Sequence, residues 1–193
     1  MTAASPVTIR KIGIIGAGRI GCGIAHVCAV SGFDVYLVDI STEALERAMS
    51  NLTDSLGHQV SKGKISEAIR TAALDRISTG TGLAMLSECD LVIEAVTENE
   101  QIKRQTLKSL GSHLKPEALI ATCSSSISIT RLAARTDRPQ KFIGMHFMNP
   151  VPPMRVVELI PGIATDDETF EAVQELTGKL GRVCKLSLVE EVV

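Results

Sequence analysis

The sequence predicts an α/β fold with a doubly wound, mostly parallel sheet, and three observations support this prediction. The apolar run Ile12–Ile15 is followed at once by a Gly-x-Gly-x-x-Gly turn, which opens a segment of helical periodicity. A second apolar run, Val35–Val38, ends on the acidic residue Asp39. Short apolar runs then alternate with amphipathic segments, as in proteins whose parallel strands are joined by helices. We therefore expect a Rossmann-type dinucleotide-binding domain.

The three glycines of the turn each have a different steric role. Gly16 permits a tight turn, Gly18 lets the backbone approach a pyrophosphate, and Gly21 lets the helix pack closely on its strand. The first N–H groups of that helix and its positive dipole end then face the phosphates. Because Arg19 and Ile20 begin the helix, we also expect them at the cofactor.

Asp39 stands 23 residues beyond Gly16, at the carboxyl end of the second strand. A carboxylate at this place accepts hydrogen bonds from both ribose hydroxyls of an adenosine and repels a 2'-phosphate. Ile40-Ser41-Thr42 follow, without the Arg or Lys that would favour NADP. The sequence thus predicts NAD as the cofactor.

Length and composition indicate one domain. A chain of 193 residues with 45% hydrophobic content can bury one substantial core, which we expect over residues 1–187, with a short tail at 188–193. The net charge is −2 and charges of both signs are interspersed, so a nucleic-acid partner is not expected. The N-terminus lacks a signal-peptide pattern and no apolar run is long enough for a bilayer, which predicts a soluble, cytoplasmic protein without a membrane partner.

Five cysteines are scattered along the chain without a C-x-x-C pair, so we expect neither a disulfide framework nor a metal site.

The remaining elements follow from periodicity and capping residues. Ser41 is expected to cap a helix over 42–56 that Gly57 ends or weakens, with a solvated linker over 59–65. In the helix expected over 98–113, the face of Ile102, Leu107 and Leu110 should point inward. Further helices are expected over 66–74, 127–135 and 166–180, and strands over 77–79, 89–96, 119–122, 141–146, 155–160 and 183–188.

Three hydroxyls, Ser124-Ser125-Ser126, follow Cys123 at the carboxyl end of a predicted parallel strand. Open α/β sheets bind their ligands at this edge. Serine also caps helices, and at least one of the three is expected to do only that.

His146 and Glu158 lie on two strands joined by a loop that three prolines stiffen. This arrangement allows a hydrogen bond between carboxylate and imidazole, which would fix the tautomer and raise the basicity of the free ring nitrogen. The residues alone leave two interpretations open, a general base with its partner or a structural histidine beside an exposed glutamate.

The long block over 142–154, with Val157–Ile160, carries the most specific pattern, and residues 92–99 and Ser125-Ser126 support it. Over these residues, and from Lys11 to about Gly181, the chain resembles the NAD-binding domain of the L-3-hydroxyacyl-CoA dehydrogenases, particularly the bacterial 3-hydroxybutyryl-CoA dehydrogenases. The resemblance implies NAD-dependent interconversion of a short-chain (S)-3-hydroxyacyl-CoA and its 3-ketoacyl-CoA, a reaction of fatty acid metabolism.

The resemblance also implies roles for individual residues. It makes His146 the catalytic base, Glu158 its orienting partner and Ser125 a hydrogen-bond donor at the substrate oxygen. Residues implied near the nicotinamide ribose or ring are Glu98, Lys103 and Asn149, and residues implied against the coenzyme A phosphates are Lys62 and Lys64.

Two departures from the family pattern qualify this expectation. Cys123-Ser124 stand where the family usually has Asn-Thr. The family continues through a proline-glycine-phenylalanine segment into a helical domain that closes the substrate cleft and makes the dimer contacts, and Arg182–Val193 contains no such segment. A truncated, non-catalytic NAD-binding module is therefore the alternative prediction, and NAD binding should survive this loss better than turnover.

Overall fold

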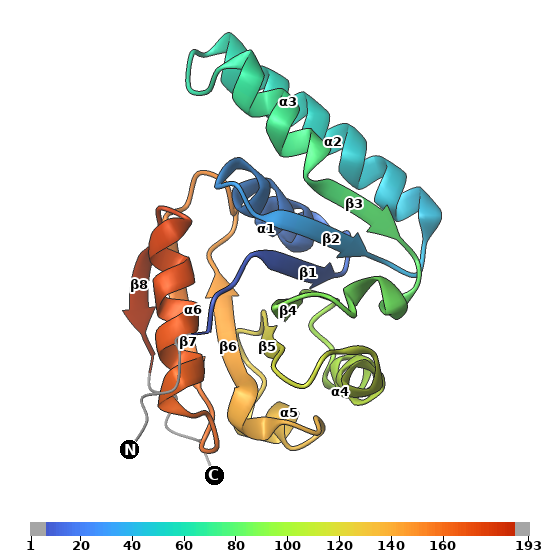
Figure 1. Ribbon diagram of the computed structural model, residues 1–193, viewed down its shortest axis with the longest axis vertical. Coiled ribbons are helices and arrows are strands. Elements are labelled where there is room, and N and C mark those ends of the chain that lie inside the picture. The colour runs from blue at the N-terminus through green and yellow to red at the C-terminus, as the bar shows by residue number, and fades with distance from the viewer. Residues whose placement is uncertain (1–6, 188–193) are drawn as a thin grey trace.

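The computed structural model describes residues 7–187, which form an eight-stranded sheet in the order β3-β2-β1-β4-β5-β6-β7-β8 (Figure 1). The strands are β1 (Lys11–Ile15), β2 (Asp34–Val38), β3 (Ile77–Gly80), β4 (Leu91–Glu94), β5 (Leu119–Thr122), β6 (Phe142–Phe147), β7 (Val156–Pro161) and β8 (Val183–Leu186). Strands β1 to β6 are mutually parallel, β7 runs antiparallel to β6, and β8 is parallel to β7. The direction of strand addition reverses between β1 and β4, so the predicted doubly wound sheet is confirmed.

Helices cover both faces of the sheet because side chains of each strand alternate between two cores. Ile12 and Ile14 of β1 belong to one core and Ile15 to the other. The first core includes side chains of α1 (Arg19–Val30), α2 (Thr42–Ser61), α3 (Glu67–Asp75) and α6 (Asp167–Lys179). The second includes side chains of α4 (Glu100–Leu110) and α5 (Ile129–Ala133). Short 3₁₀ helices lie at Leu83–Leu86, Gly111–His113 and Pro139–Lys141.

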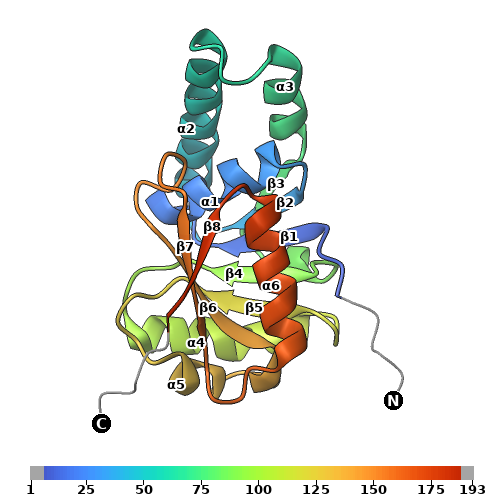
Figure 2. The same ribbon diagram turned by 90° about the vertical axis from the view of Figure 1, so that its left-hand side faces the viewer.

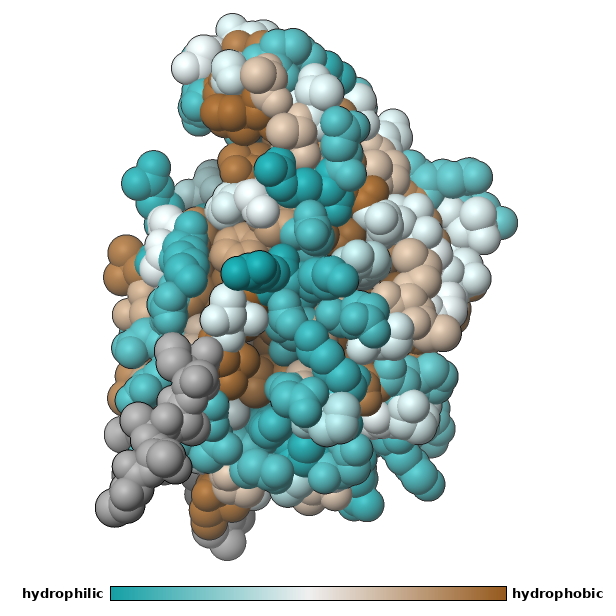
Figure 3. Space-filling model, in the orientation of Figure 1, coloured by the Kyte–Doolittle hydropathy of each residue, from teal (hydrophilic) through white to brown (hydrophobic). Residues whose placement is uncertain are grey.

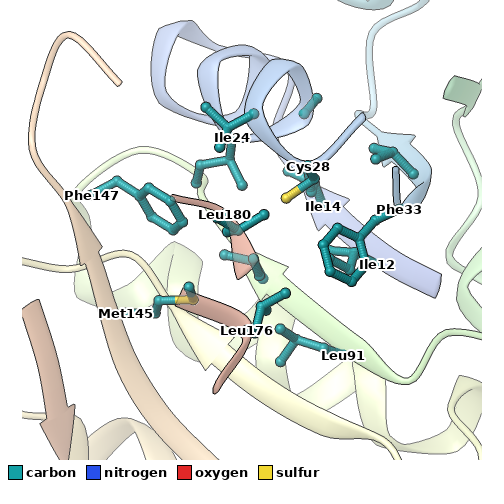
Figure 4. Packing of buried hydrophobic residues seen from close by; sticks show 14 of the residues in the cluster. Ile12, Ile14, Ile24, Cys28, Phe33, Leu91, Met145, Phe147, Leu176 and Leu180 are labelled. Carbon is teal, nitrogen blue, oxygen red and sulfur yellow. The ribbon is translucent and has the colours of Figure 1, made fainter. Parts of the chain in front are cut away.

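The first core joins α1 to α6 on one face of the sheet. Figure 4 shows Ile24 and Cys28 of α1 directed toward the strands, where Leu176 of α6 also packs. All three are at most 2% exposed, and burying an aliphatic side chain contributes about 1.5–3 kcal/mol. This packing holds the first turn of α1 at a fixed place over β1.

Helix α2 is longer than the sequence predicted. The expected end at Gly57 was wrong, because α2 continues to Ser61 and includes the first three residues of the linker expected over 59–65. A glycine inside a helix costs only about 1 kcal/mol, and contacts on both sides of it outweigh this cost. Leu56 is fully buried, and the Gln59 amide lies 2.9 Å from Nε2 of His26 in α1. Figure 2 shows that α2 and α3 form a hairpin that projects beyond the sheet.

Helix α4 begins later than predicted, and Leu107 and Leu110 are buried as predicted while Lys103 takes the inward place expected for Ile102. Asn99 caps it by accepting a hydrogen bond from the Ile102 N–H at 3.1 Å, so the helix starts at Glu100. The expectation that Ile102 points inward was wrong, since 42% of Ile102 is exposed while Lys103 is fully buried. The reason is an ion pair below the helix, described with the site.

The surface of the protein is mainly hydrophilic on the face that Figure 3 shows, where hydrophobic residues form small separate patches. Within residues 7–187, none of the helices combines the length and the apolar character that a membrane crossing needs. The predicted tail at 188–193 and the first six residues lie outside the described part of the chain.

Candidate functional site

The glycine turn between β1 and α1 has the predicted geometry. Gly16 has φ +107°, and a Cβ there would lie 2.7 Å from the Ala95 carbonyl oxygen. A Cβ on Gly21 would lie 1.8 Å from the Gly16 oxygen, so the helix packs directly on the turn. Gly18 is exposed, a Cβ on it would meet no atom within 4 Å, and it provides no side-chain cap for α1. The protein itself requires the first and third glycines, whereas the second borders open space at the helix N-terminus.

Asp39 links the end of β2 to this turn. Its Oδ2 accepts a hydrogen bond from the Ala17 N–H at 2.7 Å, and its Oδ1 accepts one from the Ser41 N–H at 3.0 Å. An ionised carboxylate offers about four acceptor positions, so about two remain for a ligand. Asp39 lines a cavity of about 480 Å³ whose apolar walls include Ile40 and Leu83. This cavity is suited to the adenosine half of a dinucleotide.

A second cavity, of about 540 Å³, lies across the carboxyl ends of β1, β4, β5 and β6. Its lining contains seven of the residues predicted from the sequence, namely Gly18, Arg19, Ile20, Glu98, Ser125, His146 and Asn149. It shares Gly18 and Ala95–Thr97 with the adenosine cavity. The two therefore form adjoining parts of one groove across the switch point, which is the binding place expected for a doubly wound sheet.

Glu98 organises the serine loop that follows β5. Its Oε1 accepts hydrogen bonds from Ser124 Oγ at 2.6 Å, from the Ser125 N–H at 3.1 Å and from Ser126 Oγ at 3.1 Å. Burial acts to raise the pKa of Glu98, but these hydrogen bonds and the charge of Lys103 outweigh it and lower the pKa below its usual range. Glu98 is thus an anion at neutral pH, and it holds the backbone of Ser125 at the cavity wall.

The capping expected for one of these three serines was wrong, because α5 is capped by Ser128, which accepts a hydrogen bond from the Arg131 N–H at 3.3 Å. Ser124 is buried and accepts a hydrogen bond from the Ile127 N–H at 3.1 Å, while Ser125 is exposed to the cavity.

Lys103 lies under this loop and not in the groove. Its side chain is fully buried, with Nζ 2.9 Å from Glu94 Oε1, 3.2 Å from the Cys123 carbonyl oxygen and 3.5 Å from Glu98 Oε2. Glu94 is also fully buried and accepts hydrogen bonds from Thr122 Oγ1 at 2.5 Å and from the Val96 N–H at 2.8 Å.

Lys103 is therefore buried directly behind the groove lining, where its ammonium group contacts Glu98 and the Cys123 carbonyl. Glu94 was not predicted, although a glutamate inside the apolar run of β4 was the available signal.

His146 and Glu158 face each other across β6 and β7. They are direct partners in the antiparallel register, so the predicted strand–loop–strand placement is present. No hydrogen bond joins them, however. His146 Nδ1 is buried without a partner among the described residues, and Glu158 Oε1 instead accepts a hydrogen bond from Lys185 Nζ at 2.8 Å. No role was predicted for Lys185.

The loop between β6 and β7 is fixed on α1. A Cβ on Gly23 would lie 2.7 Å from the Val151 side chain, so the loop packs directly on the helix. Arg182 donates hydrogen bonds to the carbonyl oxygens of Val151 at 3.0 Å and Pro152 at 3.2 Å. These contacts set the position of Asn149 in the groove, and no short motif in the sequence indicated them.

Lys62 and Lys64 lie at the turn of the projecting hairpin (Figure 2), and both are exposed. A third cavity, of about 610 Å³, lies between α1 and α2 and includes Gly18 and Arg19. Arg47, Asn51 and Ser55 line it at helical spacing along one face of α2. This polar face leads from the glycine turn toward the tip of the hairpin.

Comparison with known proteins finds one family over almost the whole chain. The family described as "3-hydroxyacyl-CoA dehydrogenase, NAD binding domain" matches residues 11–186. A 3-hydroxybutyryl-CoA dehydrogenase of Bradyrhizobium diazoefficiens is 54% identical over 179 residues, which are 93% of this chain and 61% of the relative. A probable 3-hydroxybutyryl-CoA dehydrogenase of Deinococcus radiodurans is 50% identical, over 89% of this chain and 62% of the relative.

Among solved structures, the (S)-3-hydroxybutyryl-CoA dehydrogenase of Ralstonia eutropha superposes with a TM-score of 0.91 at 45% identity. That match covers 93% of this chain and 63% of the other. The chain thus spans about three fifths of the length of these relatives.

Proposed function

Because the chain belongs to the family of the 3-hydroxyacyl-CoA dehydrogenase NAD-binding domain, we propose that it is the cofactor-binding part of an enzyme that interconverts (S)-3-hydroxyacyl-CoA and 3-ketoacyl-CoA. The observation that carries this proposal is the groove in which the glycine turn, Ser125, His146 and Asn149 meet. The names of the relatives support a short acyl chain, such as 3-hydroxybutyryl.

Two features of this chain's own residues suit the groove to NAD. The open space beside Gly18 admits a pyrophosphate at the N-terminus of α1, and Asp39 retains acceptor positions for a ribose. We assign the nicotinamide end to the cavity lined by Glu98 and Asn149. NAD supplies the hydride acceptor of the oxidation.

The protein's part in the reaction is to move a proton and hold the substrate. We assign His146 as the base that takes the proton from the C3 hydroxyl, and its imidazolium as the acid of the reverse reaction. Ser125 is exposed beside it and donates a hydrogen bond to the same oxygen, while Glu158 orients the imidazole. Lys103 acts indirectly, by holding Glu98 and the Cys123 carbonyl in place.

The coenzyme A portion is assigned to the hairpin. Lys62 and Lys64 offer two exposed ammonium groups for its phosphates, and the polar face of α2 provides a path toward the groove. The relatives extend beyond the matched part, and we propose that turnover needs such a further segment to close the substrate cleft and to make the dimer contacts that the resemblance implies.

The test is a fluorescence titration with NADH, followed by an assay of NADH oxidation with acetoacetyl-CoA. The chain should bind NADH, and a fusion to the remaining part of the Bradyrhizobium relative should oxidise it only when acetoacetyl-CoA is present. If the chain binds NADH and the fusion stays inactive, the chain is a binding module. A folded chain that does not bind NADH contradicts the proposal.

Asp39→Ala is expected to weaken NADH binding by about 10- to 100-fold, because hydrogen bonds to a charged group contribute about 1.5–3 kcal/mol. The preference for NADH over NADPH should narrow, since the charge that repels a 2'-phosphate is lost. Titration with both cofactors measures this. Asp34→Ala is the matched control, because Asp34 is an exposed aspartate at the other end of β2. Equal effects of the two substitutions would contradict the assignment.

Gly18→Val and Gly21→Ala are expected to act differently. Gly18 has φ −72° and open space around it, so valine fits the fold but fills the place of the pyrophosphate. NADH affinity should therefore fall at least about tenfold without a change in melting temperature. Gly21→Ala should lower the melting temperature, since its Cβ overlaps the Gly16 oxygen and overpacking costs about 1–3 kcal/mol or more. Normal NADH binding by Gly18→Val would show that the turn does not hold the cofactor.

A further inference from the structure

Three side chains with complementary chemistry stand in one row across the edge of the sheet. His146 of β6 is the register partner of Glu158 of β7, and Glu158 is the register partner of Lys185 of β8. Directly opposed residues of neighbouring strands lie on the same face, with Cβ atoms about 4.5–5.5 Å apart in an antiparallel pair. Glu158 therefore has an imidazole on one side and an ammonium group on the other.

The lysine holds the carboxylate in this structure. Lys185 Nζ lies 2.8 Å from Glu158 Oε1, while His146 Nδ1 is buried and has no hydrogen-bond partner among residues 7–187. A buried ring nitrogen without a partner is destabilising, because it has lost its hydrogen bonds to water without gaining others. Its need for a partner can be met by the same carboxylate that Lys185 now engages.

The bond that holds Glu158 on Lys185 is weak. The Lys185 side chain is 63% exposed, and exposed ion pairs contribute little to stability. The Glu158 side chain is 18% exposed, so a bond from it to the buried Nδ1 would be better shielded from water. Removing the ammonium group should therefore be enough to change the partner of Glu158.

We propose that Lys185 is a positioning residue that competes with His146 Nδ1 for the Glu158 carboxylate. The competition determines which nitrogen of the imidazole carries the proton. When Lys185 holds Glu158 as in this structure, neither carboxylate oxygen bonds Nδ1, so an Nδ1–H has no acceptor among the described residues and the proton resides on Nε2. When Glu158 is free, it accepts from Nδ1–H and leaves Nε2 as the basic nitrogen. The catalytic meaning of this switch rests on the proposed function, in which His146 is the base.

The test reads the tautomer directly and uses the 193-residue chain with ¹⁵N-labelled histidine. Two-dimensional NMR at about pH 9, above the ordinary imidazole range, correlates the ring nitrogens with the ring protons. The chain has four histidines, and His146→Gln identifies the His146 signals by their loss. Lys185→Met removes the charge and keeps the stem, Lys185→Arg keeps the charge, and Lys185→Met with Glu158→Met removes both the ammonium group and the acceptor.

The parent chain and Lys185→Arg should show the proton on Nε2. In Lys185→Met the protonated nitrogen should change to Nδ1, and the added Glu158→Met, which leaves no acceptor at this position, should return it to Nε2. The same tautomer in the parent and in Lys185→Met would overturn the proposal. So would a change that persists when Glu158 is also replaced.

The readout needs neither NADH nor turnover. A tautomer switch in a chain whose fusion fails to oxidise NADH would leave the competition standing and refute the proposed enzyme. An active fusion in which the tautomer does not switch would support the proposed enzyme and refute the role of Lys185.

Discussion

Lys103→Met is expected to lower the free energy of unfolding by about 3–5 kcal/mol, because it leaves Glu94 as an uncompensated charge in the core. Both side chains are 0% exposed, and the ammonium group contacts the Glu94 carboxylate, the Cys123 carbonyl and the Glu98 carboxylate. Methionine is similar in length, so the loss reflects charge and hydrogen bonds more than volume. Urea denaturation followed by circular dichroism measures the change.

Two controls distinguish the effect of the unpaired buried charge from the effect of replacing any lysine in α4. Lys108→Met changes an exposed lysine of the same helix and should alter stability by at most about 0.5 kcal/mol. Adding Glu94→Gln to Lys103→Met removes the orphaned charge and should recover most of the lost stability. If Lys103→Met is as stable as Lys108→Met, the ion pair between Lys103 and Glu94 does not hold α4 on the sheet.

His146→Ala is expected to reduce turnover by about 10²–10⁴-fold, the range for loss of a general base, while NADH binding stays near that of the parent. The measurement is single-turnover oxidation of NADH with acetoacetyl-CoA, in the fusion that carries the remaining part of the relative. Glu158→Gln should cost less, and the double variant should lose little further rate, because the two residues act as one unit. His113→Ala replaces an exposed histidine distant from the groove lining and serves as the control.

Fully multiplicative losses in the double variant would show that His146 and Glu158 act independently. A His146→Ala enzyme as fast as its parent would leave the histidine with a structural role at the end of β6.

The features that could be predicted from the sequence are those encoded over short stretches. The positive φ at Gly16, the close packing at Gly21 and the position of Asp39 belong to one strand–helix–strand unit. The alternation of apolar runs likewise specifies the parallel sheet, since a strand buried on both faces must be apolar throughout. The placement of His146 and Glu158 on two strands joined by a proline-stiffened loop was also predicted, whereas the hydrogen bond that this placement allowed is absent.

The features that could not be predicted depend on partners from other elements. The hydrophobic pattern of α4 favoured Ile102 as the inward residue, and it gave no sign that Glu94 would draw Lys103 beneath the helix. The bond from Thr122 to Glu94 spans 28 residues and appears only when β4 and β5 pair. Lys185 reaches Glu158 through the register of β7 and β8, which no periodicity in the sequence specifies.

The contact between Gly23 and Val151 has a consequence for engineering by recombination. A doubly wound sheet consists of two mononucleotide-binding halves, which invites exchange of the first half between related proteins to alter cofactor choice. Here the first half contributes Gly23 in α1, and the second contributes the loop that rests on it at a separation where no side chain fits. A chimera that joins this loop to a helix with alanine at position 23 would force the two halves apart. Compatible parents must therefore be chosen by this helix–loop pair as well as by their cofactor turns.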